Sequence, residues 1–178
     1  MITSPNLKKN PPLSGDAFSP RVFNEMMNPR NDGSTNFKYP HNGRLRIRGS
    51  ATKDELANPN SPNILVLKDG TATDLTIGRC AGLESATRAR DGTRSIEIAV
   101  FNYSQGKSFS RKGDSGSLIF DGTGDGKGGQ GRMVALLHAG KAHMITGETY
   151  VTYGTPMWQV QEWIHDIYPN ADYTKDHW

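Results

Sequence analysis

The stretch 111-RKGDSGSLIFDG-122 joins a glycine-flanked serine to the start of an apolar strand. In Gly113-Asp114-Ser115-Gly116, the glycines permit a tight turn that exposes the serine hydroxyl. The backbone N–H groups of Gly113 and Ser115 can then converge on one point and stabilise an oxyanion. The alternative interpretation is an ordinary polar turn. Because a serine hydroxyl is a weak nucleophile without a base, the rest of the chain has to be searched for one.

Hydrophobic alternation predicts strands on both sides of this turn. The stretches 64-ILVLKDG-70 and 75-LTIGR-79 flank a turn and predict a hairpin. In 94-RSIEIAVFNY-103, the alternation places Ile96, Ile98 and Val100 on one face and Glu97 on the other. The other predicted strands are 44-RLRIRGS-50, 117-SLIFDG-122, 132-RMVALLHAG-140 and 149-TYVTYGT-155.

Two helices are predicted. In 51-ATKDELANP-59, Thr52 and Glu55 have capping-box spacing, which predicts a short capped helix or turn. At the C-terminal end, Thr155 is the expected cap and Pro156 the first helical residue. The apolar stripe of this second helix consists of Met157, Val160, Ile164 and Ile167.

Strands come first in the chain and the longer helix comes last. This order predicts an all-β fold, an antiparallel barrel or sandwich with a C-terminal helix packed at its end. Residues 1–36 are rich in Pro, Asn, Ser and Gly, with one apolar cluster at 22-VFNEMM-27, and predict an irregular N-terminal arm. Residues 37–178 then form the barrel domain.

The bulk composition fits a loop-rich β protein. Hydrophobic residues make up 34% of the 178 residues, with 20 glycines and 10 prolines, which indicates many turns. The single cysteine, Cys80, excludes an intramolecular disulfide and is expected to be a buried thiol. The start of the chain lacks the apolar core of a signal peptide, and no apolar run has membrane-spanning length. These features predict a cytoplasmic protein.

The charge pattern argues against nucleic acid as a partner. A net charge of +3 falls short of a nucleic-acid footprint. Arg44, Arg46 and Arg48 alternate along one predicted strand, so a solvated strand face accounts for them, and phosphate binding is the open alternative.

Neither a metal nor a cofactor is expected. The glycine-rich loop 121-DGTGDGKGGQG-131 runs into a strand, whereas a phosphate-binding loop opens into a helix. A calcium loop would need a glutamate at its twelfth position, where this chain has Arg132. The histidines have no metal-ligand spacing with each other or with Cys80. They are His41, His138, His143, His165 and His177.

The combined order of three segments resembles the closing half of trypsin-like serine peptidases of the chymotrypsin fold. The segments are 111-RKGDSGSLIFDG-122, 133-MVALLHAG-140 and 149-TYVTYGTPMWQVQEWI-164. The stretches 41-HNGRLRIRGSATKDELANP-59 and 64-ILVLKDGTATDLTIGR-79 resemble a fungal, intracellular branch of that family. The resemblance covers residues 35 to 178 and implies that the barrel is the second lobe of the fold.

The resemblance also implies roles for individual residues. Ser115 matches the nucleophile, and the N–H groups of Gly113 and Ser115 match the oxyanion hole. Asp114 matches the buried aspartate that supports the loop by pairing with a cation or with backbone. Phe109 matches the base of the specificity pocket, and its apolar side chain argues against cleavage after Lys or Arg. The strand along which a polypeptide substrate lies matches His138, Ala139 and Gly140.

The base-bearing half of the family is missing from this chain. Upstream of Ser115 the only histidine is His41, which lies where the family approaches its second barrel. The order His41, Asp69, Ser115 satisfies the chain order of a triad, but few strand signals precede His41 to build a barrel around it. We therefore expect a serine peptidase homologue that is inactive alone and that needs a first barrel as partner. The alternative is a non-catalytic binding module or a self-associating one, because an unpaired lobe leaves an apolar face uncovered.

Overall fold

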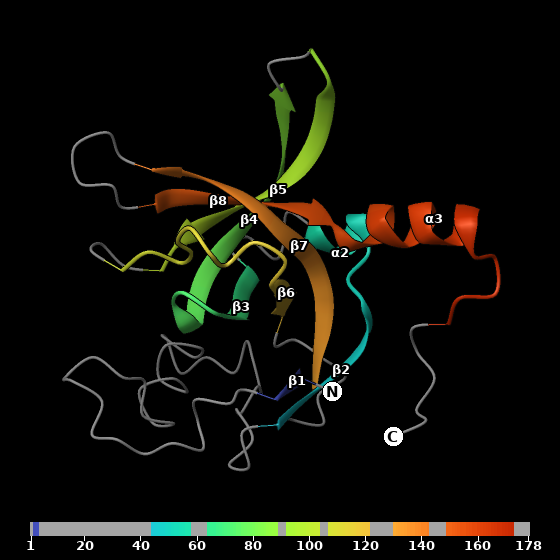
Figure 1. Ribbon diagram of the computed structural model, residues 1–178, viewed down its shortest axis with the longest axis horizontal. Coiled ribbons are helices and arrows are strands. Elements are labelled where there is room, and N and C mark those ends of the chain that lie inside the picture. The colour runs from blue at the N-terminus through green and yellow to red at the C-terminus, as the bar shows by residue number, and fades with distance from the viewer. Residues whose placement is uncertain are drawn as a thin grey trace.

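The computed structural model describes residues 2–3, 44–57, 64–88, 92–103, 107–121, 130–142 and 149–172. Within these ranges, six strands close into an antiparallel barrel (Figure 1). The barrel strands are β3 (Ile64–Gly70), β4 (Asp74–Arg88), β5 (Arg94–Asn102), β6 (Leu118–Asp121), β7 (Gln130–Ala142) and β8 (Thr149–Pro156). The predicted all-β barrel with a C-terminal helix is confirmed.

The barrel closes through the pairing of β7 with β8. Around the barrel the order is β7, β6, β3, β4, β5 and β8, and β8 returns to β7. The hairpin predicted from the sequence is β3–β4, which pairs in continuous register from Ile64 opposite Cys80 to Gly70 opposite Asp74. Beyond the barrel wall, β4 and β5 continue as a projecting hairpin (Figure 1).

Two further strands extend the sheet past β7. β2 (Arg44–Ser50) pairs with the first part of β7 in parallel, and β1 (Ile2–Thr3) pairs with β2. This parallel pair departs from the fully antiparallel sheet expected from the sequence. It arises because β2 arrives as a strap along the outside of the barrel rather than through a hairpin. The predicted boundary between residues 36 and 37 lies outside the described residues.

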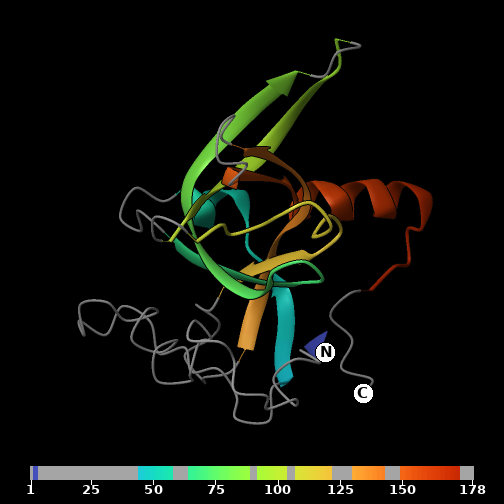
Figure 2. The same cartoon turned by 60° about the vertical axis from the view of Figure 1, so that its left-hand side comes forward.

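The core is formed by the inward side chains of all the barrel strands. Val66, Val100, Ile119 and Val134 are fully buried and belong to one cluster. Cys80 is also buried in this cluster, as expected for a structural thiol. Seen from the side, the strands wrap around this core and α3 (Met157–Ile167) reaches away from it (Figure 2).

Both predicted helices are present, with one correction. α2 (Lys53–Leu56) has the expected capping box, in which Thr52 and Glu55 bond reciprocally. α3 starts one residue later than predicted: Pro156 occupies the N-cap position, and no side chain caps the helix. Thr155 stays in β8, whose pairing with β7 extends to Pro156.

The apolar stripe of α3 is only partly buried. Met157 is buried at the start of the helix, whereas Ile167 is 70% exposed at its end. The barrel contacts only the beginning of the helix, so the apolar stripe continues beyond the part of the helix that packs against the barrel. Neither described helix combines the length and the apolar character that would let it cross a membrane.

The two faces of β5 are buried unevenly along its length. Ile98 and Val100 are buried in the core, whereas Ile96, on the same face, is 46% exposed and Glu97, on the other face, is 3% exposed. Ile96 lies in the projecting part of the hairpin, beyond the core. Glu97 lies on the opposite face, where the side chain of His138 approaches it.

We predict that Arg132→Ala lowers the free energy of unfolding by about 3 kcal/mol, because it strips the fully buried Asp121 of its cation. Nη2 of Arg132 lies 2.7 Å from Oδ2 of Asp121, and Nη1 reaches Glu55 in α2 at 2.7 Å. Urea unfolding measures the change. The control is Lys53→Ala, which removes the exposed ion pair with Glu84 and should cost less than about 1 kcal/mol. Equal costs for the two variants would refute the assignment.

Candidate active site

The serine motif forms two successive tight turns between β5 and β6. The N–H of Asp114 donates to the carbonyl of Arg111 at 3.1 Å, and the N–H of Ser117 donates to the carbonyl of Asp114 at 3.0 Å. Gly113 has a φ of 108° and Gly116 a φ of 87°, a backbone region that L side chains rarely adopt. The local sequence therefore folds this way because glycine occupies both positions.

The carboxylate of Asp114 anchors these turns to the β3–β4 turn. It is fully buried and accepts hydrogen bonds from the N–H groups of Ala72 at 2.8 Å, Thr73 at 3.2 Å and Arg111 at 2.9 Å. The hydroxyl of Thr73 donates a further bond of 2.7 Å. A Cβ at Gly70 would collide with this carboxylate, so the glycine before the turn is required by close approach.

Lys68 supplies the matching positive charge from β3. Its Nζ lies 3.2 Å from Oδ2 of Asp114, and both side chains are 0% exposed. Nζ also donates to the Thr73 hydroxyl at 2.5 Å and lies 5.6 Å from the centre of the Phe109 ring. Burial lowers the pKa of Lys68, and the charge and hydrogen bond of Asp114 oppose that shift.

The pKa of Asp114 is held below its ordinary value. Burial alone would raise it, but the N–H of Arg111, the Thr73 hydroxyl, the N–H of Ala72 and the charge of Lys68 together outweigh burial. Asp114 is therefore a carboxylate anion at neutral pH, in contact with backbone and with a cation.

The anchored loop presents Ser115 to solvent beside β7. The loop joins β7 through the N–H of Gly116, which donates to the carbonyl of Leu137 at 2.7 Å, and through the N–H of Leu137, which donates to the carbonyl of Ser117 at 3.0 Å. Ser115 is exposed, and its hydroxyl donates to the backbone carbonyl of His138 at 3.4 Å.

Two backbone N–H groups of the serine loop have no hydrogen-bond acceptor among the described residues. Those of Asp114 and Gly116 are used within the fold. In the described part of the chain, the N–H groups of Gly113 and Ser115 donate to no protein acceptor. These are the two donors expected for an oxyanion hole, and their availability leaves them able to bind a developing negative charge.

His138 forms a β-bulge and has a buried carboxylate as neighbour. Leu137 pairs with Gly154 and Ala139 pairs with Tyr153, so His138 is an extra residue in β7 opposite β8. Its Nε2 lies 2.9 Å from Oε2 of Glu97, and its side chain is 45% exposed. The imidazole thus faces Glu97, and only the carbonyl of His138 contacts Ser115.

The remaining predicted substrate-strand residues follow along β7. Ala139 is half-buried and Gly140 is exposed. A Cβ at Gly140 would lie 2.8 Å from Thr149 and 3.6 Å from the hydroxyl of Ser110. The Ser110 hydroxyl forms a buried 2.6 Å hydrogen bond with that of Thr152. This hydroxyl pair could not be predicted from the sequence, because its members lie 42 residues apart.

The side chain of Phe109, the predicted base of a specificity pocket, is buried in the core. Its side chain is 1% exposed and packs in the main hydrophobic cluster. Its N–H donates to Oδ1 of Asn102 at 2.8 Å, and its carbonyl accepts a hydrogen bond from the Thr76 hydroxyl at 2.7 Å. Phe109 therefore packs within the core, and its predicted part in a specificity pocket stays a prediction. The hypothetical triad partner His41 lies outside the described residues.

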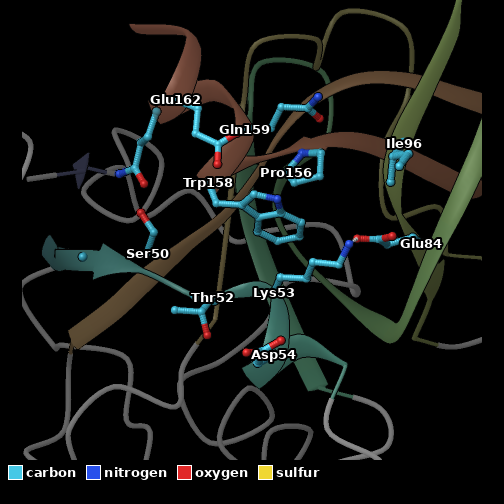
Figure 3. Close-up of a pocket in the computed structure, with 13 residues that line it drawn as sticks. Ser50, Thr52, Lys53, Asp54, Glu84, Ile96, Pro156, Trp158, Gln159 and Glu162 are labelled. Atoms are coloured by element: carbon cyan, nitrogen blue, oxygen red, sulfur yellow. Dashed lines mark ion pairs between the residues drawn. The ribbon is translucent and has the colours of Figure 1, made fainter. Parts of the chain in front are cut away.

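A groove lies between the β2–α2 strap, the β4–β5 hairpin and α3 (Figure 3). Its volume is about 740 Å³, and the Trp158 ring lies at its centre. The ion pair of Lys53 with Glu84 spans its mouth at 2.9 Å. A cavity of about 190 Å³ adjoins it, lined by Leu56, Cys80, Ile98 and Trp158 among others. No residue of the serine loop lines either space, so the groove is a separate feature.

No group of three or more His, Cys, Asp or Glu side chains within the described ranges is arranged to hold a metal ion. Most of the glycine-rich loop at 121–131 lies outside those ranges, as do the side chains of Arg44, Arg46 and Arg48.

Comparison with known proteins gives structural matches only. No protein-family model and no curated protein sequence matches the chain. One similar solved structure is a glutamic-acid-specific serine protease that uses a histidine triad in substrate binding, with 17% identity and a TM-score of 0.48. Another is the chymotrypsin of Cellulomonas bogoriensis, with 20% identity and a TM-score of 0.46. Each match covers 75% of this chain, which spans only 60% and 58% of the two structures respectively.

We predict that Lys68→Met lowers the free energy of unfolding by about 3 to 5 kcal/mol, because it leaves the Asp114 carboxylate buried without its cation. The double variant Lys68→Met/Asp114→Asn should recover part of that loss, since neither charge then remains buried. Urea unfolding of the single and double variants measures the coupling. Costs that simply add would show that the two side chains do not act as a pair.

Acid should destabilise the fold through Asp114. Because the folded-state pKa of this carboxyl is depressed, the unfolded chain takes up the proton first, near its ordinary pKa of about 3.9. The stabilisation is complete above that pH and is lost as the pH falls through the folded-state pKa. Unfolding free energies measured between about pH 6 and 3 should therefore fall more steeply for the wild type than for Asp114→Asn. Parallel curves would contradict the assignment.

Proposed function

We propose that this chain is the nucleophile-bearing lobe of a trypsin-like serine peptidase. Ser115 would attack the carbonyl carbon of a polypeptide substrate, and the N–H groups of Gly113 and Ser115 would stabilise the oxyanion. The observation that carries the proposal is the exposed Ser115 hydroxyl beside two N–H groups that have no acceptor among the described residues. The buried pair of Lys68 with Asp114 holds that arrangement in place.

The proposed lobe does not cleave peptides alone. In the described residues, Ser115 contacts a backbone carbonyl and no imidazole nitrogen. A serine without an aligned base keeps only the effects of the oxyanion donors and of substrate binding, orders of magnitude below a full triad. A first barrel, as a separate chain or as part of a longer gene product, would bring the histidine and aspartate. We also propose that the chain belongs to a fungal branch of this peptidase family.

A second candidate function is non-catalytic binding. The groove around Trp158 and the exposed apolar side chains of Trp163, Ile167 and Tyr168 favour it. Apolar surface of this kind marks interaction sites with a polypeptide or a second copy of the chain. In that case Ser115→Ala would leave binding unchanged, because no groove residue belongs to the serine loop.

The test is intact-mass analysis of the folded chain after exposure to a fluorophosphonate, beside Ser115→Ala. We expect one slow adduct on the wild type and none on the variant. Added imidazole should accelerate the reaction, because a small base can reach the exposed hydroxyl. Model peptides should remain uncleaved. Equal labelling of the two proteins, or none on folded wild type even with imidazole, would reject the nucleophile assignment and favour the binding module.

A further inference from the structure

Glu97 is a buried carboxylate that the proposed nucleophile lobe does not use. It is 3% exposed, and its Oε2 is buried with no hydrogen-bond partner in the described part of the chain. The imidazole of His138 approaches it, with Nε2 2.9 Å from this oxygen but without hydrogen-bond alignment. Buried polar atoms are nearly always satisfied, so an orphaned carboxylate oxygen calls for a reason.

His138 connects this carboxylate to the serine. The backbone carbonyl of His138 accepts the Ser115 hydroxyl at 3.4 Å, while its side chain faces Glu97. Nε2 is turned to Glu97, which leaves Nδ1 without a partner among the described residues. The bulge makes the side chain half-exposed, so it can turn about its Cα–Cβ and Cβ–Cγ bonds without disturbing the core.

We propose that His138, oriented by Glu97, is the proton acceptor for Ser115 within this barrel, and that it gives the chain a slow transfer activity toward activated esters and phosphonates. The inference rests on the proposed function, because it supplies a base for the same nucleophile. His138 is the base, and Glu97 is a positioning residue that acts through it.

The proposed reaction needs no co-reactant other than water. The O–H bond of Ser115 breaks as its proton passes to Nδ1 of His138, and Oγ forms a bond to the acyl carbon. With an aryl ester as substrate, the bond between the acyl carbon and the phenolic oxygen breaks, and the phenolate departs with the electron pair. The carboxylate of Glu97 stabilises the imidazolium, which then releases its proton to solvent. In the second half of the reaction, water attacks the acyl carbon of the acyl-serine and gives a proton to His138. The bond from that carbon to Oγ then breaks, Ser115 takes the proton back from His138, and the carboxylic acid is released.

The choice of substrate class follows from the leaving group. An amine must be protonated while its C–N bond breaks, which demands an imidazolium held in line with the scissile bond. A nitrophenolate or a fluoride leaves as an anion and makes no such demand. Because the His138 ring rests against Glu97 and is not held in line with a scissile bond, the pair supports the second class and not peptide cleavage.

The deciding experiment compares labelling rates of the folded full chain with a fluorophosphonate, and hydrolysis of p-nitrophenyl acetate, with and without added imidazole. Without imidazole, His138→Gln should lower both rates on the order of a hundredfold, the usual contribution of a general base. The variant keeps the backbone carbonyl that Ser115 contacts, so the loss reports the side chain. Added imidazole should restore the labelling rate. His165→Gln, on the solvent side of α3, is the matched control and should change nothing.

Glu97→Gln should slow the wild type several-fold and have no effect in the His138→Gln background, a coupling that a purely structural role would not produce. If Glu97→Gln fails to fold, His138→Gln and its rescue by imidazole decide the matter.

Two outcomes overturn the inference while the proposed function stands. In one, wild type and His138→Gln label Ser115 at equal rates without imidazole. In the other, Ser115 is labelled only when imidazole is present. Labelling that is equal in Ser115→Ala, or absent in the folded wild type even with imidazole, overturns the proposed function as well.

Discussion

The buried ion pair of Lys68 with Asp114 is the interaction on which the candidate site depends. Two charges with 0% exposure are tolerated only because each is neutralised by the other and because backbone and hydroxyl donors satisfy the remaining carboxylate lone pairs. Those donors come from two loops, so the pair ties the β3–β4 turn to the serine loop. The position of the Ser115 hydroxyl is therefore set by charge neutralisation inside the barrel rather than by the loop alone.

The same constraint explains which N–H groups stay available. The buried Asp114 carboxylate fixes the serine loop against the β3–β4 turn. After the serine, the N–H of Gly116 donates to the carbonyl of Leu137 and joins the chain to β7. What remains at the surface is the pair of donors on Gly113 and Ser115. The availability of the two proposed oxyanion donors is thus a consequence of how the loop is anchored. Nothing in that anchoring provides a base, which is why the buried Glu97 carboxylate beside His138 matters for the proposed reaction.

The barrel also leaves surfaces that it does not cover itself. α3 is supported only at its start, and the strap formed by β2 and α2 stands off from the helix enough to leave the groove around Trp158 (Figure 3). The groove and the serine loop lie on different elements, so binding at one requires no change at the other. A catalytic and a binding role are compatible on this scaffold.

Features that depend on residues close together in the chain could be predicted before the fold was known. Hydrophobic alternation predicted the barrel strands. The spacing of Thr52 and Glu55 predicted the capping box, and the glycines around Ser115 predicted the tight turns. Alternation divides a strand into two faces, but how far each residue is buried depends on what the other strands bring to it, so the exposure of Ile96 and the burial of Glu97 could not be read from the pattern. Only the tertiary structure decided that Lys68, set within an apolar run, meets Asp114, and that Glu97 meets His138. Both are contacts between side chains distant in sequence, created when the barrel closes and removes them from water.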